Sequence, residues 1–77
     1  MSRIIVANRR GHQVFEWEVA DTEEAKALVE EAERIVREAR QQGCAVSKKV
    51  GGTHVLDDGP FDPHAEEYQI IAPVAGG

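Results

Sequence analysis

The apolar and polar positions at the start of the chain follow the pattern of two β-strands. Residues 3–8 contain a continuous apolar run, and residues 13–19 alternate apolar with polar side chains. The connection between them, residues 9–12, is short and contains Gly11, so it can reverse the chain direction. We therefore expect an antiparallel hairpin. The inward face of its second strand would carry Phe15, Trp17 and Val19.

A change in the spacing of the apolar residues after the hairpin predicts a single long helix. Between Asp21 and Gln42, apolar residues recur at spacings of three and four, which places them on one face of a helix. Asp21 is followed three residues later by Glu24, a pairing typical of a helix N-terminus, and Gly43 stands at the usual C-terminal position. The predicted apolar stripe consists of Ala25, Leu28, Val29, Ala32, Ile35, Val36 and Ala39.

Strand-like alternation returns after the helix. Residues 44–50 and 53–56 flank a pair of glycines that can form a turn, which predicts a second hairpin. The loop that follows contains Phe61, which we expect to insert into the core. Residues 68–71 are apolar enough to predict the last strand.

The predicted order is strand, strand, helix, strand, short strand, strand, which gives an α+β fold. One long helix would pack across one face of a mixed sheet of four to five strands. The apolar runs 4–7 and 70–72 are typical of central strands, so we expect the first and last strands to lie side by side. This is the β-grasp arrangement. Residues 1–72 would form that domain, and residues 73–77 would form a flexible tail.

Length and charge narrow the classes of function. With 77 residues there is room for one domain, and a deep enclosed active site is not expected in so small a core. The net charge of −5 argues against binding to nucleic acid or to an anionic membrane surface. The single cysteine, Cys44, cannot form an internal disulfide and is expected to be a small core residue. No apolar run approaches the length of a membrane span, so we expect a cytoplasmic protein.

The end of the chain carries the most informative chemical signal. Residues 72–77 read Ala-Pro-Val-Ala-Gly-Gly, with too little apolar bulk to pack, and would reach about 20 Å when extended. Glycine has no side chain, so a backbone ending in Gly76 and Gly77 can pass a narrow channel and leaves its carbonyl unhindered. The functional group would be the α-carboxylate of Gly77.

With this order of elements and this ending, the sequence resembles the ubiquitin-like β-grasp superfamily. The ending, residues 71–77, is similar to that of the sulfur-carrier branch, which includes the small molybdopterin synthase subunit and the thiamine-biosynthesis carrier. The chain also looks like the bacterial ubiquitin-like modifiers. Residues 53–67 have no counterpart in the named carriers, which favours a dedicated modifier system.

The resemblance implies a protein that is a substrate of catalysis and not an enzyme. A ubiquitin-activating-type enzyme would use ATP to adenylate Gly77, with Gly76 passing the channel and Pro73, Val74 and Ala75 contacting that enzyme. The domain itself would bind no cofactor. The activated carboxylate would pass to a conjugating enzyme and then to lysines of target proteins. In a sulfur carrier it would instead become a thiocarboxylate with a sulfurtransferase as partner.

Other hypotheses stay open beside this one. A non-covalent interaction or assembly module is the main competing class, and an enzyme would need His54 or His64 as an acid–base group. Lys48 and Lys49 are candidate acceptors for chain formation, although adjacent lysines on a strand more often keep an edge soluble. The three histidines show no spacing typical of metal ligands, so no metal site is predicted.

Overall fold

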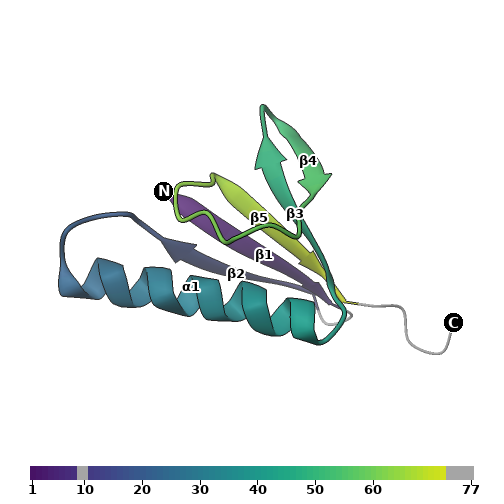
Figure 1. Cartoon of the computed structure of the whole chain (residues 1–77), viewed down its shortest axis with the longest axis horizontal. Helices are drawn as coiled ribbons and strands as arrows, with labels where there is room; N and C mark the ends of the chain where they lie inside the picture. The colour runs from purple at the N-terminus through teal and green to yellow at the C-terminus, as the bar shows by residue number, and fades with distance from the viewer. Residues whose placement is uncertain (9–10, 73–77) are drawn as a thin grey trace, which may run out of the picture.

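One long helix lies across one face of a five-stranded sheet in the computed structural model, which describes residues 1–8 and 11–72 (Figure 1). Within these residues, no helix combines the length and the apolar character needed to cross a membrane. The elements in chain order are β1 (Ser2–Asn8), β2 (Gly11–Trp17), α1 (Glu23–Gln41), β3 (Ala45–Val50), β4 (Thr53–Leu56) and β5 (Glu67–Ile71).

The sheet has the order β2-β1-β5-β3-β4, which confirms the predicted β-grasp arrangement. β1 and β5 are parallel neighbours, with Ile4 opposite Tyr68, and every other pairing is antiparallel. The first and last strands therefore lie side by side inside the sheet, as their apolar runs predicted. The predicted flexible tail, residues 73–77, falls outside the described residues.

Two hairpins form the flanks of the sheet. The β1–β2 ladder is uninterrupted from Ser2 opposite Trp17 to Asn8 opposite Gly11. In the second hairpin, Val50 lies opposite Thr53, and the two-residue connection consists of glycines at φ 58° and 83°. Tight hairpin turns of this kind need positive φ at both positions, which only glycine adopts without strain. The glycine pair thus fixes the register of β3 and β4.

The helix begins one residue later than predicted. Thr22, not Asp21, is the N-cap, because its Oγ1 accepts a hydrogen bond of 3.1 Å from the backbone N–H of Ala25. Asp21 lies outside the helix, and its carboxylate pairs with Lys26 at 3.2 Å. At the other end Gln42 is the C-cap and Gly43 takes φ 83°, as the glycine position predicted.

The core lies between α1 and the sheet. Its largest fully buried side chains are Trp17, Tyr68, Ile4 and Val36. Three alanines of α1, seven residues apart, are buried against the sheet at positions 25, 32 and 39. Because alanine is small, this row lets the helix backbone approach the strands closely. Val19 and Leu28 were predicted to be inward but are exposed, since β2 ends before Val19 and Leu28 lies at the rim of the stripe.

The loop between β4 and β5 closes one side of this core. The Phe61 ring packs against Trp17 and Tyr68, with centroids 5.5 Å and 5.4 Å away, which confirms its predicted insertion. Trp17 Nε1 donates to the carbonyl of Pro63 at 2.9 Å, and the backbone N–H of Asp62 donates to the Tyr68 hydroxyl at 2.8 Å. The two buried aromatic residues therefore satisfy polar groups of the loop as well as filling space.

Arg40 ties the same loop to the end of α1. Its guanidinium donates to the carbonyl of Gly59 at 2.7 Å and to the carbonyl and carboxylate of Asp57 at 2.9 Å and 3.1 Å. These bonds satisfy loop carbonyls that make no strand ladder. The irregular segment between β4 and β5 is thus held by the helix and by the core.

Replacing Tyr68 by Phe tests whether this polar anchoring stabilises the fold. The substitution leaves the ring and removes the acceptor of the Asp62 N–H, so we expect a loss of about 1–3 kcal/mol in the free energy of unfolding. Urea denaturation followed by the fluorescence of Trp17, the single tryptophan, measures it. An unchanged free energy would show that the ring alone holds the loop.

Candidate functional site

The face of the sheet that does not contact α1 carries a mixed set of polar and apolar side chains, which we call the open face. Strand alternation and the register assign its members, because residues opposite one another across a ladder share a face. They are Arg3, Ile5 and Ala7 of β1, His12, Val14 and Glu16 of β2, Ala45, Ser47 and Lys49 of β3, His54 and Leu56 of β4, and Glu67, Gln69 and Ile71 of β5.

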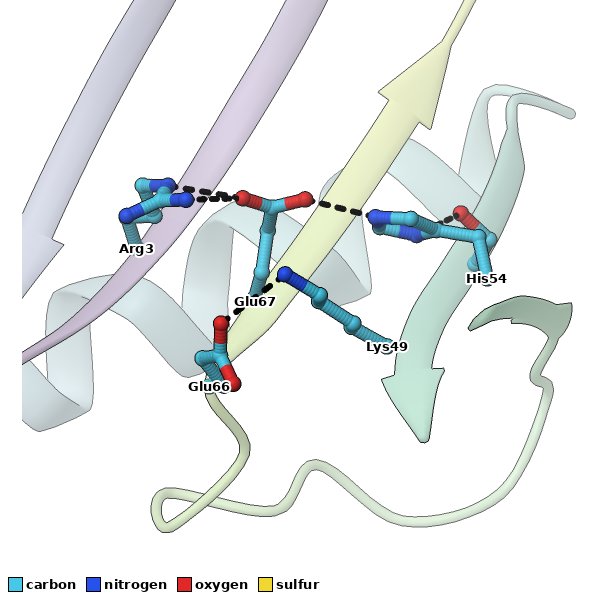
Figure 2. Close-up of polar contacts among 6 residues, drawn as sticks. Arg3, Lys49, His54, Glu66 and Glu67 are labelled. Carbon is cyan, nitrogen blue, oxygen red and sulfur yellow. Dashed lines mark hydrogen bonds and ion pairs between the residues drawn. The ribbon is translucent and has the colours of Figure 1, made fainter. Parts of the chain in front are cut away.

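A buried carboxylate lies at the centre of this face. Glu67 retains only 7% of its accessible surface, although its side chain points away from the apolar core. Figure 2 shows it between Arg3 and His54, which come from strands on either side of β5. Oε1 accepts from Arg3 Nε at 2.7 Å, and Oε2 lies 2.6 Å from His54 Nε2. The network therefore links β1, β5 and β4 across the sheet.

The network continues through the second nitrogen of the imidazole. His54 Nδ1 lies 2.9 Å from Ser47 Oγ on β3. A neutral ring that donates a hydrogen bond from Nε2 to Glu67 can accept a hydrogen bond from the serine hydroxyl at Nδ1. A protonated ring donates hydrogen bonds from both nitrogens. The hydrogen bond from His54 holds the pKa of the Glu67 carboxyl below its ordinary value. Burial raises this pKa, whereas the hydrogen bond and the positive charge of Arg3 lower it further. Glu67 is thus an anion at neutral pH.

The order serine, histidine, carboxylate is the order of a hydrolytic relay, but the surroundings do not suit that chemistry. Ser47 lies within a strand between two ladders. Among the described residues, grooves of about 310 to 400 Å³ lie beside the C-terminal half of α1, and Ser47 does not line these grooves. A nucleophile needs a pocket for its substrate and donors for the developing oxyanion. We therefore interpret the contacts among Arg3, Glu67, His54 and Ser47 as a structural link across the open face, which we call the clamp.

The lysines of the chain differ in accessibility. The Lys49 side chain is 27% exposed, and its Nζ lies 3.0 Å from Oε2 of Glu66. Figure 2 shows this pair beside the Glu67 network. Lys48 points to the helix side, is 25% exposed and lies 3.8 Å from Asp62. The strand that carries them is not an edge strand, contrary to the solubility interpretation of adjacent lysines. Lys26, which the sequence pattern did not single out, is 57% exposed on α1.

The end of β5 is the second place of interest, because the glycine pair follows it in sequence. Figure 1 shows β1, β5 and α1 ending at the same side of the molecule. An apolar groove of about 310 Å³ lies there, lined by Val6, Ile35, Ile70 and Ala72 among others. Pro73, Val74, Ala75, Gly76 and Gly77, the residues predicted to contact or undergo activation, lie outside the described residues.

Comparison with protein-family models, with curated proteins and with solved structures found no match. The fold assignment therefore rests on the strand order and register.

The remaining candidates do not meet at one place. His12 lies on β2, His54 belongs to the clamp, and His64 is exposed in the loop, where its backbone N–H donates to Asp62. Within residues 1–8 and 11–72, no three potential metal-ligating side chains converge. Cys44 is half-buried and packs against the core, in agreement with its predicted role. Arg3, Ser47 and Glu67 were missed because only the register brings them together.

Replacing Glu67 by Gln tests the clamp. A carboxylate whose folded pKa is lowered contributes stability above its unfolded value, near 4.5, and loses it as the pH falls through the folded value. We expect the variant to lose about 1–3 kcal/mol at neutral pH and to show a weaker decline in stability on acidification. Urea denaturation at a series of pH values measures both effects.

The neighbouring Glu66→Gln variant is the matched control. The Glu66 side chain is 61% exposed, so loss of its pair with Lys49 should cost less than about 1 kcal/mol. Equal effects of the two substitutions, or an unchanged acid profile for Glu67→Gln, would contradict the central role of Glu67.

Proposed function

We propose that this chain is a ubiquitin-like protein modifier, activated at the Gly77 carboxylate and joined to lysines of target proteins. The observation that carries the proposal is the position of the glycine pair relative to the fold. β5 is the middle strand of a β-grasp sheet, and Gly76 and Gly77 follow shortly after its end. The carboxylate would be available either as the encoded end or after proteolytic processing.

The dimensions suit delivery of a carboxylate into another protein. Five extended residues span up to about 17 Å, so residues 73–77 could enter an active site while the sheet and helix stay outside it. The two last residues have no side chain, which reduces the width of the channel they need.

The surface beside the end of β5 supports a protein partner. Ile71 is exposed on the open face and Ala45 lies opposite it on β3. Leu56, on the neighbouring β4, is 78% exposed. Exposed apolar side chains that gather on one face of a sheet are typical of interaction surfaces. We propose that the activating enzyme contacts this part of the open face while it holds Pro73, Val74 and Ala75.

The chemistry lies in the partner enzymes. The Gly77 carboxylate attacks the α-phosphorus of ATP, and pyrophosphate leaves, which gives an acyl adenylate. A cysteine thiolate of the enzyme then attacks the carbonyl and AMP leaves as the thioester forms. Finally a lysine amine displaces that thiolate and forms the isopeptide bond. The chain supplies an unhindered carbonyl and no acid–base group.

The similarity of residues 71–77 to carrier endings favours a second candidate function. In a sulfur carrier, a persulfide of a sulfurtransferase attacks the same adenylate, and AMP leaves as an acyl disulfide forms. A second thiol then attacks the S–S bond, which releases the thiocarboxylate and leaves a disulfide between the two thiols. A non-covalent interaction module is the third candidate, and it would need neither glycine.

Deletion of Gly76 and Gly77 tests the covalent proposals. We expect the truncated chain to keep its stability and to lose all conjugates in its native cells, because its new C-terminal carboxylate, on Ala75, lies two residues short and has a methyl side chain beside it. A chain tagged before Met1, which is exposed, allows recovery of both forms for mass spectrometry. Conjugates that persist after truncation would contradict the proposal.

Mass spectrometry after protease digestion distinguishes the modifier from the sulfur carrier, because a modifier leaves a peptide of its C-terminus on the acceptor lysine. No lysine or arginine follows Lys49, so trypsin would leave residues 50–77 on the acceptor, whereas cleavage after glutamate leaves only residues 68–77. That shorter remnant on other proteins would establish the modifier. A free chain in which one oxygen is replaced by sulfur would establish the carrier. An unmodified carboxylate in all conditions would exclude both.

A further inference from the structure

The outer edge of β2 is long and makes no backbone pairing within residues 1–8 and 11–72. β2 is the last strand on its side of the sheet, and no described residue pairs with its outer edge. Its seven residues form an uninterrupted ladder with β1 and include no proline, lysine or bulge. Natural edge strands usually carry such features, because free backbone groups invite pairing with another chain. The opposite edge, β4, has four residues.

One hydrogen bond shows which backbone groups of β2 point outward. Arg3 N donates to Glu66 O at 3.1 Å, so Arg3 directs its backbone polar groups toward β5. Successive residues of a strand direct these groups to alternate sides, so Ile4 and Val6 direct theirs toward β2. Their partners Phe15 and Gln13 point back toward β1. The residues between and beside those partners, at positions 12, 14 and 16, therefore have outward N–H and C=O groups.

These three residues are spaced to pair with a second copy of themselves. In an antiparallel arrangement with a two-fold axis at Val14, Val14 lies opposite its own copy and His12 lies opposite Glu16. All three pairs are then of the hydrogen-bonded type, in which each pair exchanges two bonds. A shift to the next in-phase register leaves one of the three residues without a partner in the strand. The symmetric register therefore satisfies the most backbone groups.

The side chains agree with this register. His12, Val14 and Glu16 are all on the open face, so the two-fold axis places an imidazole beside a carboxylate twice. Val14 is 57% exposed and would meet a second valine directly across the junction. Opposite polar partners and β-branched pairs stabilise neighbouring strands, and no like charges face each other. The side-chain pairs and the outward backbone groups thus fit a second copy of this chain.

We propose that β2 pairs with β2 of a second copy, joining the two sheets into one continuous sheet. The inference is independent of the proposed function. Because only edge strands meet, the interface is small, and the net charge of −5 on each copy opposes association. The dimer should therefore be weak and reversible, and more populated at millimolar than at micromolar concentration.

Sedimentation equilibrium of the full chain, across that concentration range at physiological salt, measures the association. Val14→Pro removes the outward N–H at the two-fold axis and leaves the bonds to β1, because proline is tolerated where a strand N–H faces solvent. We expect at least a tenfold loss of affinity. Val14→Ile, which keeps the N–H, and Leu56→Pro, on the outer edge of β4, should both retain the dimer.

A charge exchange keeps the test valid if Val14→Pro fails to fold. His12→Glu places carboxylates opposite one another at the junction and should weaken the dimer, and adding Glu16→Lys should restore it. A wild-type chain that stays monomeric at millimolar concentration would overturn the proposal. So would a dimer that is insensitive to the charge exchange or lost in Leu56→Pro, which would point to another surface or a different partner for β2.

Discussion

The parallel pairing of β1 with β5 is the constraint on which the rest of the structure depends. It joins the first strand to the last, with Arg3 opposite Glu67 and Ala7 opposite Ile71. Closing so long a loop is costly in chain entropy, so the pairing must be supported by burial. That support is present on one face, where Ile4 and Tyr68 are fully buried under α1.

The pairing of β1 with β5 also determines which side chains meet on each face of the sheet. On the helix side it brings Tyr68 beneath the loop between β4 and β5, where the ring of Phe61 closes the core. On the open face it brings Arg3 to Glu67, and β3 and β4 then place His54 on the other side of the carboxylate. A carboxylate with charged or polar partners on both sides can remain buried and ionised. The clamp and the core are thus consequences of one register.

The sequence predicted the elements better than it predicted their contacts. Both hairpins, the single helix and the central pairing followed from apolar runs and glycine positions, because these signals are local. The N-cap was misplaced because Asp21 and Thr22 are both good caps, and only the backbone conformation decides between them.

The clamp could not be derived from the sequence, because it depends on long-range register. Glu67 precedes an apolar run and looks like a polar flank, and its partner Arg3 lies 64 positions away. A shift of one residue in the β1–β5 register would place Glu67 on the opposite face from Arg3. Local patterns do not carry that information. A prediction of the clamp would have required the register of three ladders at once.

The most direct test of the central pairing is a set of interstrand NOEs measured by NMR together with amide hydrogen exchange. We expect NOEs between β1 and β5 in the parallel register, with Ile4 close to Tyr68 and Val6 close to Ile70. We also expect the slowest-exchanging amides to belong to these two strands. NOEs in another register, or rapid exchange in β5 while the two hairpins stay protected, would contradict the central role of this pairing.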